Sequence, residues 1–155
     1  MLREFVETGR YSFREKFDSW EEAIAASCEP IIKEGVIEPV YVEAVINCVK
    51  KYGPYIIIAP NIAMPHSTEG AEGVNETAIC FMKVEEPVHF DPEDPEKDAR
   101  LFFVLASADH EKHLENMMRL SEMLMNEELV EELLEAKSKE DLLAIDKKYL
   151  ENQRG

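Results

Sequence analysis

The sequence predicts an α/β fold, a three-layer sandwich in which a central β-sheet is covered by helices on both faces. Three short apolar stretches, at 55–58, 76–84 and 101–107, alternate with longer segments that have the spacing of amphipathic helices. Such alternation is typical of a sheet layered between helices. No segment rich in Gly, Ser or Pro divides the 155 residues, so we expect a single domain over 1–155.

The composition fits a globular protein, with 45% hydrophobic and 32% charged residues. No apolar run approaches the roughly 20 residues that span a bilayer, and the N-terminus MLREFVETGR does not resemble a signal peptide. Three scattered cysteines without CxxC spacing, Cys28, Cys48 and Cys80, predict reduced core residues of a cytoplasmic protein. The net charge of −16 argues against nucleic acid or an anionic membrane as partner and is compatible with docking a basic protein surface.

The first third of the chain predicts mainly helix. Residues 1–17 are weakly patterned, and three aromatic residues suggest a short strand or an apolar flap: Tyr11, Phe13 and Phe17. Ser19-Trp20-Glu21-Glu22 has the form of a capping box, which starts a helix that Pro30 is expected to interrupt. A second helix is expected from Pro39 to Gly53, with an apolar stripe formed by Val42, Val45, Ile46 and Val49.

The stretch GPYIIIAPNIAMPHST, at 53–68, predicts a strand followed by a loop that carries a candidate functional histidine. Tyr55–Ile58 is expected to be a short strand buried on both faces, because apolar β-formers follow a Gly-Pro stop. A loop then presents His66 just beyond the strand. Pro65 fixes its own backbone and restricts Met64 to an extended conformation, so the histidine is carried by a stiff segment.

The second half predicts two strands and three helices. A turn-rich loop at 69–75 precedes a strand at 76–84, and the proline- and acid-rich segment 85–99 is expected to be a surface loop. After the strand at 101–107, a long helix should start around Asp109 to Glu111 with one apolar face, formed by Leu114, Met117, Leu120, Ser121 and Leu124. Further helices are expected over Glu127–Ala136 and after Ser138.

Two histidines have matching placements. His66 follows the strand at 55–58, and His113 follows the strand at 101–107 near a helix start. Sites in α/β sheets gather at the carboxyl ends of strands, so the two imidazoles should converge if the strands are neighbours. A helix N-terminus is also a natural anion site. The combination indicates a site that handles a phosphoryl group.

Imidazole chemistry supports this hypothesis, because a pKa near 6.5 leaves the ring mostly neutral and nucleophilic at neutral pH. A phosphoryl group brings roughly −1.5 to −2 charges, which His113, nearby amides and the Ser67 hydroxyl could bind. His89 and His110 are expected to be ordinary surface residues. A metal site built from His66, His113 and a carboxylate lacks HxxxH or HExxH spacing, so we expect neither a metal nor a cofactor.

The motifs IIIAPNIAMPHS, VNETAICFMKVEEPVHF, LFFVLAS and HLENMMRLSEML together resemble the IIA component of the bacterial phosphoenolpyruvate-dependent sugar phosphotransferase system. The resemblance covers about Trp20 to Leu134, is to the mannitol/fructose type (type 2), and is most like ascorbate-type members. It implies a mixed sheet and a phosphotransferase with a phosphohistidine intermediate. His66 would accept phosphate from the phosphocarrier HPr and pass it to a IIB component, and His113 would be the second active-site histidine.

Two positions depart from the family pattern. Asn61 stands where the family usually has glycine, and Lys50 stands nearest the arginine that mannitol-type members carry in the preceding helix. Lys50 is a point charge and lacks the bidentate fork of arginine. The resemblance implies uptake of a sugar, with ascorbate-like or pentitol-like substrates as candidates, and peripheral association with a membrane IIC component only through IIB. Two alternatives stay open: a regulatory IIA-like module whose phosphorylation controls a partner protein, and an unrelated metal-dependent hydrolase.

Overall fold

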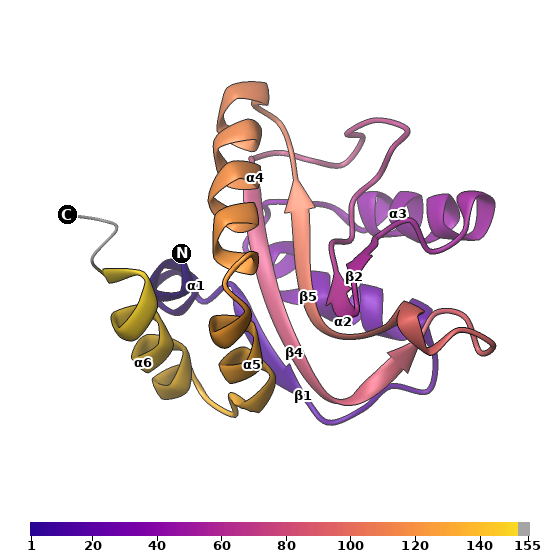
Figure 1. The fold of residues 1–155 in the computed structure, drawn as a ribbon. Helices are drawn as coiled ribbons and strands as arrows, with labels where there is room; N and C mark the ends of the chain where they lie inside the picture. Colours follow the sequence, from indigo (N-terminus) through magenta and orange to yellow (C-terminus); the bar gives the residue numbers. More distant parts are fainter. Residues whose placement is uncertain (152–155) are drawn as a thin grey trace.

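The computed structural model describes residues 1–151, which form a five-stranded mixed sheet between two layers of helices (Figure 1). The strands are β1 (Tyr11–Arg14), β2 (Ile57–Ala59), β3 (Asn61–Ala63), β4 (Ala78–His89) and β5 (Asp98–Ala106). The helices are α1 (Leu2–Thr8), α2 (Trp20–Lys33), α3 (Pro39–Tyr52), α4 (His110–Leu124), α5 (Glu127–Glu135) and α6 (Lys139–Tyr149), with one 3-10 turn, η1 (Pro95–Lys97). The predicted α/β sandwich with a mixed sheet is confirmed.

The order of the strands in the sheet is β1-β4-β5-β3-β2. β1 runs parallel to β4 and β3 runs parallel to β5, whereas β4–β5 and β2–β3 are antiparallel. Ile62 on β3 lies opposite Leu101 on β5. Because these parallel neighbours end at the same edge of the sheet, the segments that follow them emerge side by side at the top of Figure 1.

The sheet separates two hydrophobic cores. Helices α2 and α3 cover one face, and α1, α4, α5 and α6 cover the other. Side chains alternate between the faces along each strand, so Met82 and Phe102 join the first core, and Phe81 and Phe103 join the second. All four are fully buried. The central strands β4 and β5 thus contribute side chains to both cores. The end of β5 also sets where α4 begins.

Several predicted helix boundaries are confirmed. The Ser19 hydroxyl accepts the Glu22 N–H at 3.2 Å at the start of α2, and the Ser138 hydroxyl caps α6 in the same way. α3 begins at Pro39 and ends before Gly53, as expected. The short strand suggested for the first segment is β1, but α1 was not predicted, because its seven residues are too few to show a clear helical period.

The expectation that Pro30 interrupts the helix capped by Ser19 was wrong. α2 continues through Pro30 to Lys33. Proline in a helix interior removes one backbone hydrogen bond and costs about 3 kcal/mol. The turn that follows carries Ile31, which is fully buried in the first core, and its burial with the rest of the apolar face offsets that cost.

The strand expected at Tyr55–Ile58, buried on both faces, was also wrong. Tyr55 and Ile56 lie in a turn, and β2 is an edge strand with Ile58 49% exposed. Asn61 adopts a left-handed backbone conformation with φ of 72°, which turns the chain tightly into β3. β3 therefore takes the interior place beside β5, and it is β3 that leads into His66.

The loop predicted at 85–99 is confirmed only over its middle, 90–97, whereas both ends of the segment are strand. β4 continues to His89, β5 already starts at Asp98, and the register shifts between Lys83 and Val88 to accommodate Pro87. Val88 and Phe90 are buried, and Phe90 stacks on Trp20 with ring centroids 5.7 Å apart. These apolar contacts hold the acidic segment on the sheet.

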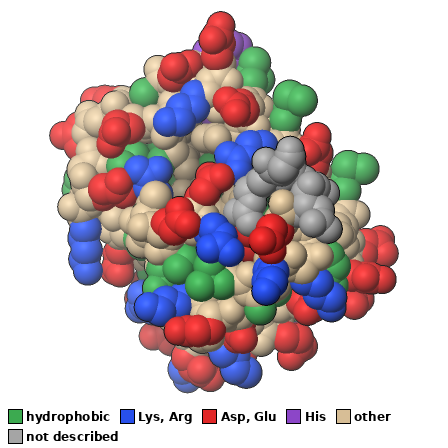
Figure 2. All heavy atoms as spheres, turned by 90° about the vertical axis from the view of Figure 1, so that its left-hand side faces the viewer, with side chains coloured by type: hydrophobic (Ala, Val, Ile, Leu, Met, Phe, Trp, Pro, Cys, Tyr) green, Lys and Arg blue, Asp and Glu red, His purple; other side chains and the backbone are tan. Residues whose placement is uncertain are grey.

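The long helix α4 begins where predicted, but only part of its expected apolar face is covered. Leu120 and Met123 are buried, whereas Leu114 is 49% exposed, because α4 starts above the end of β5. Figure 2 shows the face formed by α1, α4, α5 and α6, where acidic side chains are scattered with basic ones between them. No helix in residues 1–151 is long and apolar enough to cross a membrane.

Candidate functional site

His66 lies in the segment Met64–Ser67, directly after β3, and backbone hydrogen bonds hold this segment against the sheet. Met64 N–H donates to the Ile56 carbonyl at 2.8 Å, and the Pro65 carbonyl accepts the Leu105 N–H at 2.9 Å. The bond to Leu105 extends the β3–β5 pairing up to the residue before the histidine. The half-buried imidazole therefore stands on a backbone that the sheet itself fixes.

The imidazole of His66 is oriented through one ring nitrogen. Nδ1 lies 2.6 Å from the Met64 carbonyl oxygen. A carbonyl can only accept a hydrogen bond, so we assign the proton to Nδ1, which leaves the lone pair of the neutral ring on Nε2. Nε2 has no hydrogen-bond partner among residues 1–151. The nucleophilic nitrogen is thus free to meet a group from outside.

His113 lies close to His66, as predicted. Burial lowers the pKa of His113, and the neighbouring imidazoles of His66 and His110 lower it further. His110 is exposed, as expected, and is near enough to His113 to act on its pKa. The neutral form of His113 is favoured, so one of its ring nitrogens carries a proton that it can donate.

His113 lies in the first turn of α4, as expected. The helix begins at His110, and the N–H of His113 donates to the Asp109 carbonyl at 2.9 Å. Asp109 also caps Lys112, so two amides near His113 are already used within the helix. The side chain of His113 is thus the group that can bind an anion, and the amides are less available than predicted.

Ser67 follows His66, but its hydroxyl is engaged within the protein. Ser67 Oγ accepts the Glu69 N–H at 3.1 Å and lies 3.7 Å from Cys48 Sγ. Burial opposes ionisation of Cys48, but hydrogen bonds from Thr68 and Ser67 outweigh it and lower the pKa of the thiol. Cys48 and Ser67 thus tie α3 to the histidine segment.

Lys50 is exposed on α3, and its side chain makes no hydrogen bond or ion pair with the other residues of 1–151. The next residue, Lys51, is the cation that reaches the loop, because its ammonium group pairs with Glu69 at 2.8 Å. Both side chains of that pair are largely exposed, so the pair contributes little to stability. The structure brings His66, His113 and Ser67 together and leaves Lys50 at the margin.

Three residues that support the site were missed by the sequence analysis. Tyr55 donates its hydroxyl hydrogen bond to the His66 carbonyl, and Tyr41 donates to the Leu105 carbonyl at 2.7 Å while accepting the Ser67 N–H at 3.3 Å. The Thr77 hydroxyl accepts the N–H groups of Ala108 and Asp109, just before α4. Tyr55 stood in the sequence within an apolar run, and no local pattern marks Tyr41 or Thr77.

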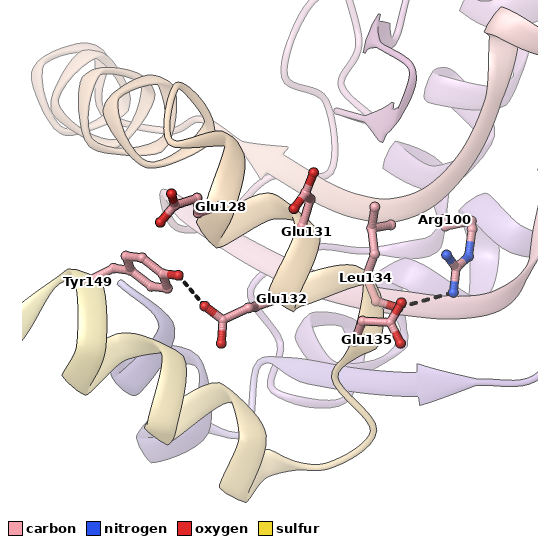
Figure 3. A pocket seen from close by; sticks show the side chains of 7 residues that line it. All are labelled: Arg100, Glu128, Glu131, Glu132, Leu134, Glu135 and Tyr149. Carbon is pink, nitrogen blue, oxygen red and sulfur yellow. Dashed lines mark hydrogen bonds between the residues drawn. The ribbon is translucent and has the colours of Figure 1, made fainter.

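One cavity lies away from the histidines. It has a volume of about 550 Å³ and is formed by α5, α6 and β5, and its lining includes Arg100, Leu134, Tyr149 and four glutamates (Figure 3). Its Tyr149 hydroxyl donates to Glu132, and Arg100 donates to the Leu134 carbonyl at 3.1 Å. Across residues 1–151, no cluster of three or more His, Cys, Asp or Glu side chains could hold a metal ion. His66 and His113 are both only partly buried, so both remain accessible from the surface.

Comparisons with known proteins agree with this arrangement. The chain is 27% identical over 127 residues to the ascorbate-specific PTS system EIIA component of Shigella boydii serotype 4, covering 81% of each protein. It is 33% identical over 126 residues to the mannitol-specific cryptic phosphotransferase enzyme IIA component of Escherichia coli K12, covering 81% of this chain and 84% of the relative.

A solved structure extends the likeness to the fold. The complex of enzyme IIA for mannitol with phosphorylated enzyme IIB from Escherichia coli matches with a TM-score of 0.74 and 28% identity, covering 88% of this chain and 92% of that one. The sequence profile of the family "Phosphoenolpyruvate-dependent sugar phosphotransferase system, EIIA 2" matches residues 4–149. The chain belongs to this family, the type 2 EIIA components of the sugar phosphotransferase system.

Proposed function

We propose that His66 Nε2 accepts a phosphoryl group from phospho-HPr and passes it to a IIB component during sugar uptake. The observation that carries this proposal is the hydrogen bond from Nδ1 to the Met64 carbonyl, which leaves Nε2 as the free nitrogen. The lone pair of Nε2 forms the new bond to phosphorus as the bond to the donor breaks. The positive charge that develops on the imidazole is shared with Nδ1–H, where the Met64 carbonyl stabilises it.

His113 is proposed to donate a hydrogen bond to the phosphoryl oxygens. Its low pKa favours a neutral ring, so it binds the group without adding a fixed positive charge. A full cationic site would bind the phosphoryl group so strongly that onward transfer would suffer. Ser67 supports the segment through Cys48 and Glu69, and Lys50 is at most a peripheral charge for an approaching partner.

The reaction is proposed to need no metal or cofactor, because a neutral imidazole is already nucleophilic and the donor brings an activated phosphoryl group. The single domain over 1–155 would act in the cytoplasm and reach a membrane IIC component only through IIB. The phosphorylated IIB bound to enzyme IIA for mannitol supports IIB as the acceptor. Ascorbate-like or pentitol-like sugars remain the candidate substrates of the whole system.

The test is to incubate the protein with phosphoenolpyruvate, enzyme I and HPr, and to follow acid-labile phosphate by intact mass. His66→Ala should take up no phosphate. His89→Ala is the matched control, because His89 is an exposed histidine paired with Asp98 at the far end of β4. Normal labelling of His66→Ala would disprove the proposal. Adding the cognate IIB should discharge the wild type, whereas a purely regulatory module would keep its label.

A further inference from the structure

Tyr55 contacts His66 at two places. It lies in the turn between α3 and β2, its hydroxyl donates to the His66 carbonyl, and its ring packs against the imidazole. The two ring centroids are 5.2 Å apart and the ring planes are nearly perpendicular, at 89°. Burial raises the pKa of Tyr55, so the hydroxyl keeps its proton and remains a donor at neutral pH. One side chain therefore holds both the backbone and the side chain of the histidine.

The hydrogen bonds that hold Pro65 and Ser67 fix the backbone on either side of His66 but do not orient its imidazole. Leu105 holds Pro65 directly and holds Ser67 through the Tyr41 hydroxyl, so both neighbours of His66 are fixed to β5. Neither of these contacts touches the imidazole. The ring itself is held by the Met64 carbonyl at Nδ1 and by the Tyr55 ring. Without Tyr55, the imidazole would lose its aromatic contact and keep the hydrogen bond to Met64.

We propose that Tyr55 is a positioning residue for phosphoryl transfer: it keeps Nδ1–H on the Met64 carbonyl and thereby directs Nε2 toward the incoming phosphoryl group. The proposal rests on the proposed function of His66. It adds that Tyr55 determines which nitrogen of the imidazole reacts. A rotated ring would break the bond to Met64, mix the two tautomers and present Nε2 in fewer molecules. Phosphate uptake would slow in proportion.

The experiment compares three variants with the wild type. Tyr55→Phe keeps the ring and loses the hydroxyl, and Tyr55→Leu loses both. Tyr149→Phe is the matched control, because it removes a tyrosine hydroxyl that donates to Glu132 in the cavity of Figure 3, away from the histidines. Two quantities are measured: the tautomer of His66 in the unphosphorylated proteins by ¹⁵N NMR of the imidazole, and the rate of phosphate uptake from phospho-HPr by rapid quench.

We expect the wild type and Tyr149→Phe to show the Nδ1–H tautomer and equal rates. Loss of one neutral hydrogen bond predicts a rate about 5-fold lower for Tyr55→Phe. Loss of the ring contact as well predicts a rate about 10- to 50-fold lower for Tyr55→Leu, with mixed tautomers. A merely structural role would lower stability without changing the tautomer, so the NMR signal separates the two roles.

A folded Tyr55→Leu with either the wild-type tautomer or the wild-type rate would overturn the proposal. If Tyr55→Leu does not fold, Tyr55→Phe decides, and a rate within about 2-fold of the wild type would overturn it. If the wild type itself takes up no phosphate, the function proposed for His66 fails. The tautomer comparison needs no phosphate, so it still supports or overturns the orienting role of Tyr55.

Discussion

Replacing Thr77 by valine should loosen the start of α4 and with it the placement of His113. Thr77 is 6% exposed, and its hydroxyl accepts the N–H groups of Ala108 at 2.8 Å and of Asp109 at 2.7 Å. Valine has the same shape and no hydroxyl, so the change removes these two hydrogen bonds without opening a cavity, together with a long one, at 3.5 Å, that the hydroxyl donates to the Asp109 carbonyl. Each of the two shorter bonds is worth about 1 kcal/mol net, because Ala108 and Asp109 are exposed and water can partly replace the lost acceptor. The predicted loss in the free energy of unfolding is about 2 kcal/mol.

Urea unfolding followed by the fluorescence of Trp20, the single tryptophan, measures this loss. With a slope of about 2 kcal/mol per molar urea, the midpoint should fall by about 1 M and the slope should stay unchanged. Thr77→Ser is the control, because it keeps the hydroxyl and loses one methyl group, worth about 0.8 kcal/mol. If Thr77→Val proved as stable as Thr77→Ser, the two hydrogen bonds would not be what holds the start of α4.

Four further outcomes are expected. His113→Ala should still be labelled on His66, at a rate reduced by about tenfold to a hundredfold. Rapid-quench rates measure the reduction, and label found on His113 in the wild type would show that the roles of the two histidines are reversed. Because the pKa of His113 is lowered, its NMR titration should have a midpoint below 6.5, and its contribution to stability should be lost as the pH falls through that midpoint. Phosphate uptake from purified phospho-HPr should persist in the presence of a chelator, and loss of uptake would favour a metal-dependent enzyme. Asn61→Ala should destabilise the protein by about 1 kcal/mol and Asn61→Gly should not, because φ at this position is 72°; equal midpoints in urea would contradict this.

The sequence predicts the layers of this fold well, because its strands and helices carry strong periodic signals. The long helices began at the residues expected from Ser19, Pro39, Asp109 and Ser138. Prediction failed where tertiary contacts outweigh local preference. Burial of Ile31 carries α2 through Pro30, and burial of Val88 and Phe90 keeps an acidic, proline-rich segment on the sheet.

For the candidate site, the sequence identified the two histidines but not what holds them. His66 and His113 were predicted from their places after two strands, and the parallel pairing of β3 with β5 brings them together. The supporting bonds join residues far apart in the chain, such as Tyr41 to Leu105 and Thr77 to Asp109. No local pattern can indicate such pairs, since each depends on the completed sheet.

The strand order also bears on how the chain folds. β4 and β5 are consecutive antiparallel strands, so their pairing closes a short loop and can form early. β1 reaches β4 by pairing Tyr11 with Phe81, and β3 must dock on β5 in parallel, so both contacts carry a larger loop-closure entropy. If they form after the rate-limiting step, changes in β1 or β3 speed unfolding and leave the folding rate nearly unchanged. The proposed phosphoryl site would then be among the last parts of the molecule to assemble and the first to open.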